Sequence, residues 1–267
     1  MTLAEAAVAV LTTASPTDKV ELTRQTAAAW REGRFAAVGR SVPPDRPARP
    51  EHPALLPPRD MAKRSRATSL KGRIALLHAL AHIELNAIDL AWDIIARYPD
   101  EAMPAAFFDD WVTVASDEAR HFELLAVRLA ELGARYGDLP AHDGLWRAAL
   151  DTADDLAARL AVVPMVLEAR GLDVTPRTIV ELTAHGDGAS AALLQVIYDD
   201  EITHVAAGCR WFETLCARRG VEPVTTWQAL IARYFGGRMK PPFNRDGRGR
   251  AGMAAAYYDQ GEGGEGP

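Results

Sequence analysis

Two short motifs in the sequence place a carboxylate and an imidazole three residues apart. Glu118 precedes His121, and Glu201 precedes His204. Side chains three residues apart lie on one face of an α-helix, so each pair could share a metal ion. One such motif alone is a weak indication, because surface helices also contain hydrogen-bonded Glu–His pairs.

A single glutamate in an apolar, helix-like segment precedes each motif. Glu84 lies 34 residues before Glu118, and Glu168 lies 33 residues before Glu201. The order is therefore Glu, Glu-x-x-His, Glu, Glu-x-x-His, with nearly equal spacing in the two halves. We interpret this part of the chain as two copies of a helix pair.

Metal binding would explain why six polar residues share the apolar faces of four helices. Buried carboxylates without a cation repel one another and are costly. Four carboxylates and two imidazoles suit iron or manganese, and four negative charges balance two divalent ions. We therefore expect two metal ions, with iron in first place and manganese as the alternative. The predicted ligands are Glu84, Glu118, His121, Glu168, Glu201 and His204.

An aspartate directly precedes each motif. Asp117 and Asp200 point about 100° away from the glutamate beside them, toward a neighbouring helix. Histidines that bind a metal usually donate their other N–H to a carboxylate or a carbonyl. Because the pseudo-repeat pairs the two motifs, we predict that Asp117 hydrogen-bonds His204 and that Asp200 hydrogen-bonds His121. The alternative is that both are ordinary surface aspartates.

At these positions the sequence resembles the ferritin-like di-iron carboxylate superfamily. Such proteins hold two metals in a four-helix bundle, with one Glu on each of two helices and a Glu-x-x-His on each of the others. This resemblance covers about residues 70–220 and implies the same fold and the same ligand set. Three phrases are similar to a bacterial ferritin-like family of unestablished function, and that closer resemblance extends over most of the chain. They are His82-Ile83-Glu84-Leu85, Asp117-Glu118-Ala119-Arg120-His121 and Tyr198-Asp199-Asp200-Glu201-Ile202-Thr203-His204-Val205.

Apolar residues recur at helical spacing in the segments that contain the predicted ligands, so the expected fold class is all-α. Pro164 lies four residues before Glu168, and a proline inside a helix frees a carbonyl and kinks the helix. Such exceptions to the local rules tend to mark functional sites. A turn at 171–174 and a separate helix from 175 to 185 are expected next. The predicted bundle helices cover residues 70–98, 104–133, 150–171 and 189–219.

Additional segments precede and follow the bundle within what we expect to be a single domain. Two N-terminal helices, 2–14 and 18–32, should form a hairpin on the bundle, with Thr17 capping the second helix. The proline-rich segment 41–60 is unsuited to helix or sheet, and we prefer a strap across the bundle to a linker. The predicted divisions of residues 1–267 are 1–40, 41–68, 69–220, 221–258 and a disordered tail at 259–267.

Basic residues gather in two segments, Arg59–Arg73 and Arg238–Arg250. A short helix is expected at 225–235, and the second basic segment that follows it shows no helical period. These segments would suit an RNA substrate. However, the net charge of −6 favours solvated loops and argues against a dedicated nucleic-acid binder.

The cysteines and the hydropathy of the chain indicate the cellular compartment in which the protein is expected to work. Cys209 and Cys216 lie two helical turns, about 10 Å, apart, too far for a disulfide, and are expected to be buried thiols in a reducing compartment. The apolar stretch Met1–Leu11 lacks a basic region and is interpreted as a helix, not a signal peptide. No stretch approaches the roughly 18 uncharged apolar residues of a membrane span. We expect a soluble, cytoplasmic protein without a membrane partner, and a homodimer is compatible with the sequence.

Other polar residues near the motifs have simpler interpretations. His78 and His82 lie one turn apart, and His82 is about 160° around the helix from Glu84. We therefore expect His82 to be a partly buried, hydrogen-bonded histidine. Tyr198, one turn before Glu201, is expected to be half-buried, and the alternative is that it reaches the metal.

The leading functional hypothesis is an oxygen-activating di-iron oxidoreductase, a hydroxylase or oxygenase, acting on an unknown organic substrate. The tRNA-modifying di-iron hydroxylases resemble the chain in ligand order, so the substrate class includes RNA beside small molecules. The alternatives are a ferroxidase or metal-handling protein and a non-catalytic metal-binding bundle.

Overall fold

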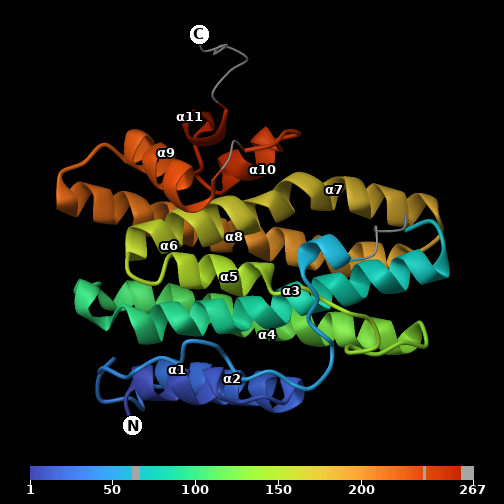
Figure 1. Ribbon diagram of the computed structural model, residues 1–267, viewed down its shortest axis with the longest axis horizontal. Helices are drawn as coiled ribbons and strands as arrows, with labels where there is room; N and C mark the ends of the chain where they lie inside the picture. Colours follow the sequence, from blue (N-terminus) through green and yellow to red (C-terminus); the bar gives the residue numbers. More distant parts are fainter. Residues whose placement is uncertain (62–66, 237–238, 260–267) are drawn as a thin grey trace. The chain divides into compact units, whose positions relative to one another are not determined.

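The computed structural model describes residues 1–61, 67–236 and 239–259. In these ranges the regular structure is helical, apart from one isolated parallel bridge between Leu55 and Ala141 (Figure 1), which confirms the all-α fold class. The chain divides into two compact units, each described by itself, and the single domain stays a prediction. Unit 1 contains Met1–Leu150 and Val180–Leu193, and unit 2 contains Asp151–Ile179 and Leu194–Pro267.

Two long helices, α3 and α4, pack side by side in unit 1 (Figure 1). The N-terminal helices α1 and α2 pack on each other, α1 against α3 and α2 against α4, so the expected N-terminal hairpin is confirmed. The bounds are α1 Leu3–Leu11, α2 Pro16–Arg31, α3 Leu70–Arg97, α4 Ala105–Glu131 and α5 Gly144–Asp151, with 3-10 turns at Pro58–Asp60 and Pro99–Glu101.

The start of α2 corrects the expected cap. Ser15, not Thr17, is the N-cap, and its Oγ accepts a hydrogen bond from the backbone N–H of Asp18 at 3.3 Å. Pro16 explains the shift, because its missing N–H and fixed φ suit the first position of a helix.

The proline-rich segment is a strap and not a free linker. Its backbone accepts a hydrogen bond at Asp45 from Trp146 Nε1 at 3.0 Å and donates one from Ala48 to the carbonyl of Leu11 at 2.8 Å. Arg49 reaches Asp89 on α3 with an ion pair. The strap therefore ties α1, α3 and α5 of unit 1 together, while residues 62–66 lie outside the described ranges.

Unit 2 contains most of the long helix α8 together with shorter helices, and one of its turns is a π-helix, labelled η3. α9 packs on α6 and on α11. The last turn of α7 and the first turns of α8 belong to unit 1. The bounds are α6 Leu156–Val162, η3 Val163–Glu168, α7 Ala169–Ala184, α8 Gly188–Arg219, α9 Pro223–Tyr234, α10 Arg245–Arg250 and α11 Ala255–Tyr258.

The expected turn at 171–174 is wrong, because α7 runs unbroken through it and carries Pro176 inside the helix. Pro176 lacks the N–H that would bond the carbonyl of Leu172. The side-chain amide of Asn244 donates to that carbonyl instead, at 3.0 Å. A partner 72 residues away in the chain therefore lets the helix continue.

The basic segment also differs from the expectation, because residues 245–250 form α10. Asn244 caps this helix by accepting from the N–H of Gly247 at 3.0 Å. Arg248 is fully buried and paired with Asp173, so its charge is not offered to a ligand in solution. Arg238 and residues 260–267 lie outside the described ranges.

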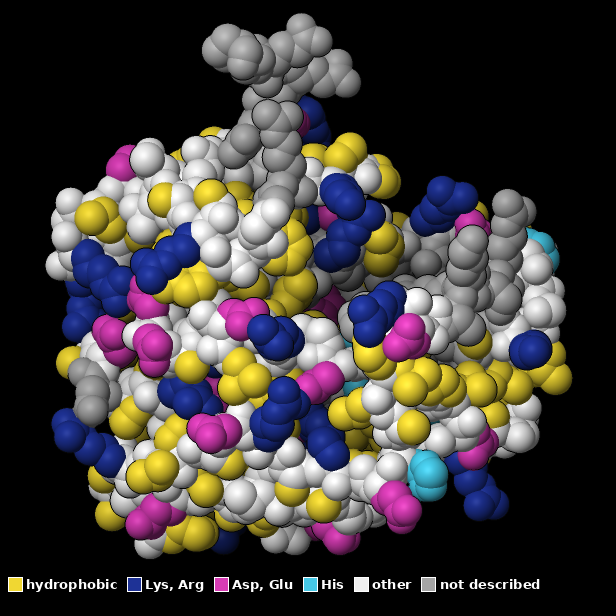
Figure 2. Space-filling view, in the orientation of Figure 1, with side chains coloured by type: hydrophobic (Ala, Val, Ile, Leu, Met, Phe, Trp, Pro, Cys, Tyr) yellow, Lys and Arg dark blue, Asp and Glu magenta, His cyan; other side chains and the backbone are white. Residues whose placement is uncertain are grey.

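Charged side chains of both signs lie intermixed on the face drawn in Figure 2. The described residues there form no continuous basic patch of the kind that binds nucleic acid.

One described helix, α3, is long and apolar enough to cross a membrane by length and composition, although the sequence suggested none. Within its most apolar window, 67% is buried inside the protein. Helices in a protein core meet the same criterion, and α3 packs against α1 and α4 in unit 1.

Candidate metal centre

Helices α3 and α4 bring three predicted ligands together in the core of unit 1. Glu84 comes from α3, while Glu118 and His121 come from one face of α4. All three are buried, with exposed fractions of 3%, 0% and 0%. Each lies in a stripe of apolar residues at helical spacing, so the packing that buries the stripe also buries the ligand.

The atoms of this triad have the spacing of a metal site. Nδ1 of His121 lies 3.3 Å from Oε2 of Glu84 and 3.4 Å from Oε2 of Glu118. One candidate ligand atom from each of the three residues lies within 4.8 Å of the others. Carboxylate oxygen and imidazole nitrogen are the donors that iron, manganese and zinc accept in proteins.

The electrostatics of the triad favour a cation. Burial raises the pKa of Glu84 well above its ordinary value, and the nearby carboxylate of Glu118 raises the pKa further. His121 acts in the opposite direction and lowers the pKa of Glu84. A divalent ion between the carboxylates would let both ionise, because it replaces their repulsion by attraction.

The other three predicted ligands lie in unit 2, Glu168 on η3 and Glu201 and His204 on α8. Nδ1 of His204 lies 3.8 Å from Oε1 of Glu201, and His204 is buried with 1% exposure. Glu168 is the last residue of the π-turn η3. Instead of a regular α-helix, the chain forms a π-turn around Pro164, a feature frequently found at functional sites.

Close packing fixes this turn against α8. A Cβ atom on Gly208 would lie 2.5 Å from the Cβ and Cγ atoms of Pro164, so only glycine allows the observed contact. Gly208 lies one turn after His204. The turn that carries Glu168 thus contacts the helix that carries the second motif close to its histidine.

The two predicted aspartate–histidine pairs stay predictions, as does the joining of the six ligands in one centre. Asp117 lies 3.5 Å from Nη2 of Arg120 on its own helix. Asp200 is partly exposed on α8.

The histidines that precede Glu84 have the structural role expected of them. His82 Nδ1 lies 2.9 Å from the hydroxyl of Tyr136, and its Nε2 lies 3.2 Å from the carbonyl of His142. Burial lowers the pKa of His82 to about 4. His78 accepts a hydrogen bond at Nε2 from the N–H of Gly137 at 2.9 Å. Both side chains organise the loop that follows α4.

Sequence reasoning missed Asn244, which contacts both α7 and α8. Its Nδ2 donates to the hydroxyl of Tyr198 at 2.9 Å, in addition to the carbonyl of Leu172. Tyr198 is more buried than expected, with 8% exposure. The sequence held one signal, an asparagine three residues before Gly247 as a helix cap, but nothing that named its distant partners.

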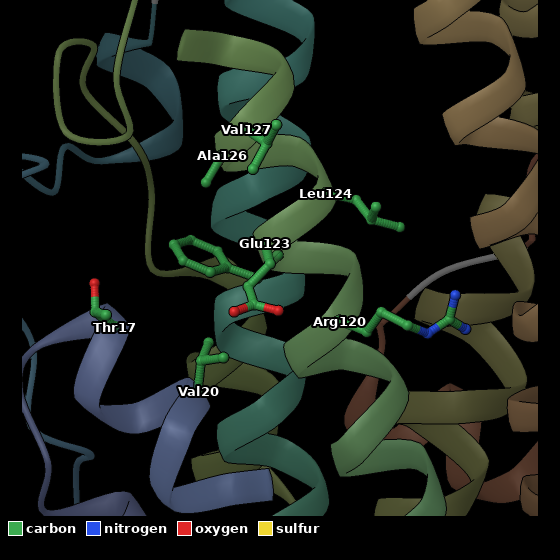
Figure 3. Close-up of a pocket in the computed structure, with 8 residues that line it drawn as sticks. Thr17, Val20, Arg120, Glu123, Leu124, Ala126 and Val127 are labelled. Carbon is green, nitrogen blue, oxygen red and sulfur yellow. The ribbon is translucent and has the colours of Figure 1, made fainter.

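A surface cavity of about 400 Å³ lies between α2 and α4 of unit 1 (Figure 3). Thr17 and Val20 line it from α2, and Glu123, Ala126 and Val127 from α4. Its lining contains none of the predicted ligands. This cavity is therefore not the candidate metal centre.

Comparisons with known proteins place the chain in a family of unknown function. The family described as "Protein of unknown function (DUF455)" matches residues 12–259. An uncharacterised protein of Haemophilus influenzae is 42% identical over 215 residues, which are 79% of this chain and 74% of the relative. No solved structure matches the chain.

Proposed function

The chain belongs to the DUF455 family, and for it we propose a dinuclear metal centre, most simply of iron, that serves an oxidoreductase. The six ligands would be Glu84, Glu118, His121, Glu168, Glu201 and His204. One observation carries the proposal: Glu84, Glu118 and His121 converge in the core of unit 1 with their ligand atoms within 4.8 Å.

The chemistry of the donors supports iron, with manganese as the alternative. Carboxylates and imidazoles without thiolates are the ligands of non-haem iron and of manganese. When bound, two reduced irons supply the electrons with which dioxygen is activated. The chain's own part is to hold the donors on packed helices and to keep water from the buried triad of Glu84, Glu118 and His121.

A small organic molecule is the substrate class that we propose, in preference to RNA. Arg248 of the basic segment is buried against Asp173, and charges of both signs are intermixed on the face drawn in Figure 2. We place the protein in the cytoplasm as part of the same proposal, because Cys209 and Cys216 are buried free thiols. A homodimer is the oligomeric state to test first, by light scattering.

Metal analysis tests the centre. The full-length protein, loaded with Fe²⁺ under argon, is expected to retain two ions per chain, and Glu118→Ala and Glu201→Ala should each lose at least one. Glu123→Ala is the matched control, since Glu123 is a half-exposed glutamate of α4 paired with Arg24. Unchanged metal content in both ligand variants would show that the site is misassigned.

Mixing the reduced protein with dioxygen tests the redox role. Stopped-flow absorbance should show oxidation of the bound iron within seconds, faster than free Fe²⁺ in the same buffer. Inertness toward dioxygen would favour a metal-binding bundle without catalysis. A cage-sized assembly in light scattering would instead favour iron storage.

A further inference from the structure

Asn244 links α7, which continues directly from the π-turn that carries Glu168, to α8, which carries Glu201 and His204. Its Nδ2 donates to the carbonyl of Leu172 on α7 at 3.0 Å and to the hydroxyl of Tyr198 on α8 at 2.9 Å. Leu172 lies one turn after Glu168, and Tyr198 lies one turn before Glu201. One side-chain amide therefore connects both elements, about one helical turn from each ligand.

The carbonyl of Leu172 is available because of Pro176. In an unbroken helix that carbonyl would accept from the N–H four residues later, which proline does not have. A buried carbonyl without a partner costs about 1–3 kcal/mol. Asn244 thus donates to a buried carbonyl of α7 that needs a hydrogen-bond donor, and not to an arbitrary surface group.

Asn244 is itself held in place on its other sides. Its Oδ1 accepts from the N–H of Gly247 at 3.0 Å, and its backbone N–H donates to Oδ1 of Asp173 at 2.9 Å. Arg248 donates to both oxygens of Asp173, at 2.9 and 2.7 Å, and both side chains are fully buried. The amide therefore has a fixed orientation toward α7 and α8.

Close approach of the backbone completes the arrangement. A Cβ atom on Gly247 would lie 2.7 Å from the hydroxyl of Tyr198 and 2.9 Å from Nδ2 of Asn244. Glycine at this position lets the first turn of α10 lie directly against Tyr198. The C-terminal segment thus covers the turn of α8 that precedes Glu201.

We propose that Asn244 is a positioning residue of the metal centre. By joining Leu172 to Tyr198, it fixes the separation of α7, which follows Glu168 directly, from α8, which carries Glu201, and so the geometry of two predicted metal ligands. This inference rests on the proposed function. Metal sites need their donors held within about 0.5 Å of the binding geometry by side chains that do not bind the metal themselves.

The experiment is a Co²⁺ titration of the full-length, metal-free protein, followed by the visible absorption of the bound ion. Asn244→Ala should raise the Kd at least about 10-fold, the range typical of residues that orient metal ligands. The shape of the Co²⁺ spectrum should change as well, because band shape reports ligand geometry. Loss of stability alone would not move the spectrum of the fraction that remains folded.

Two further variants separate the link between α7 and α8 from the cap of α10. Asn244→Ser keeps an oxygen that can cap α10 but is too short to reach both Leu172 and Tyr198. It should be more heat-stable than Asn244→Ala and still bind Co²⁺ about 10-fold more weakly than the natural protein. Arg245→Ala is the control, since that residue contacts Asp259 with a largely exposed side chain and should leave Kd and spectrum unchanged.

The outcomes distinguish the two proposals. If the natural protein binds Co²⁺ and Asn244→Ser binds it with the same Kd and the same spectrum, the positioning role is overturned and the proposed metal centre is unaffected. Failure of the natural protein to bind Co²⁺, Fe²⁺ or Mn²⁺ would overturn the metal centre, and the positioning role with it.

Discussion

At the scale of single residues, the buried carboxylates Glu84 and Glu118 determine how the metal-free protein behaves. Their burial and mutual repulsion raise the pKa of Glu84, so in the absence of metal the folded state favours the protonated carboxyl more than the unfolded chain does. Such a pair opposes folding, and its presence in a core is explained by a ligand that neutralises it.

Replacing Glu118 by Gln should therefore stabilise the metal-free protein while it weakens metal binding. We expect a gain of about 1–2 kcal/mol in the free energy of unfolding at pH 7, within the range seen when buried charged groups are replaced. Urea denaturation of the protein treated with chelator measures it. Glu123→Gln, at the half-exposed ion pair with Arg24, should change stability by less than about 1 kcal/mol. Destabilisation by Glu118→Gln would contradict the repulsion argument.

His78 should make stability depend on pH. Burial lowers its pKa below the ordinary value of 6.5, with Asp138 acting weakly in the opposite direction. The unfolded chain then takes up a proton near pH 6.5 that the folded state does not, so stability falls as the pH drops from 7 to 5. Gln keeps an acceptor for the N–H of Gly137, and His78→Gln should show a smaller decrease in melting temperature over that range. His52→Gln, at an exposed histidine, is the control.

At the scale of elements, the contact between η3 and α8 holds the turn that carries Glu168. The π-turn begins at Val163, directly before Pro164, and Pro164 packs on Gly208 of α8. The wider π-turn of η3 and the absence of a side chain at Gly208 together let η3 and α8 approach closely. Regular helices with larger residues at the contact would not come as close.

Gly208→Ala should destabilise the protein by about 1–3 kcal/mol, because its Cβ would overlap Pro164. Gly171→Ala is the matched comparison on α7, where an added Cβ meets nothing within 4 Å and φ is not positive. That substitution should stabilise by about 0.5–1 kcal/mol through helix propensity. Thermal denaturation of both variants measures the difference, and equal effects would argue against the close contact.

The sequence predicted those elements whose apolar residues repeat locally. The starts and ends of α3 and α4 lie within two residues of the prediction, and the predicted ligands of unit 1 are buried in the core as expected. The unbroken α7 could not be predicted, because Pro176 locally indicates a helix break. The hydrogen bond that Pro176 cannot donate to Leu172 is replaced by one from Asn244, 72 residues away in the chain. α10 was missed for the same reason: its stability comes from Asp173 and Tyr198, not from a periodic pattern of its own.

At the scale of the whole molecule, the strap and the N-terminal hairpin meet α3 at one buried carboxylate. Asp89 pairs with Lys19 of α2 and with Arg49 of the strap, and both Asp89 and Lys19 are fully buried. The strap itself was predicted from its prolines and interspersed leucines. The ion pairs of Asp89 were not predicted, because no sequence pattern relates it to Arg49 and Lys19, which lie 40 and 70 positions earlier.

Asp89→Asn should leave the buried ammonium of Lys19 and the partly buried guanidinium of Arg49 without their anion, and lower stability by about 3–5 kcal/mol. Proteases should then cut within residues 41–60 faster than in the natural protein, since the strap loses its ion pair with α3. Asp143→Asn breaks another ion pair of the strap, with the exposed Arg46, and should cost less than about 1 kcal/mol. Similar proteolysis of both variants would contradict a special role for the buried group.

The position of Asp89 in the chain also sets an order for folding during synthesis. The hairpin and the strap leave the ribosome before α3, so Lys19, Arg49 and the apolar side of α1 have no partner until Asp89 and its helix have emerged. Until then the first forty to sixty residues stay without their native contacts and expose apolar surface. Chaperones bind segments of this kind on nascent chains.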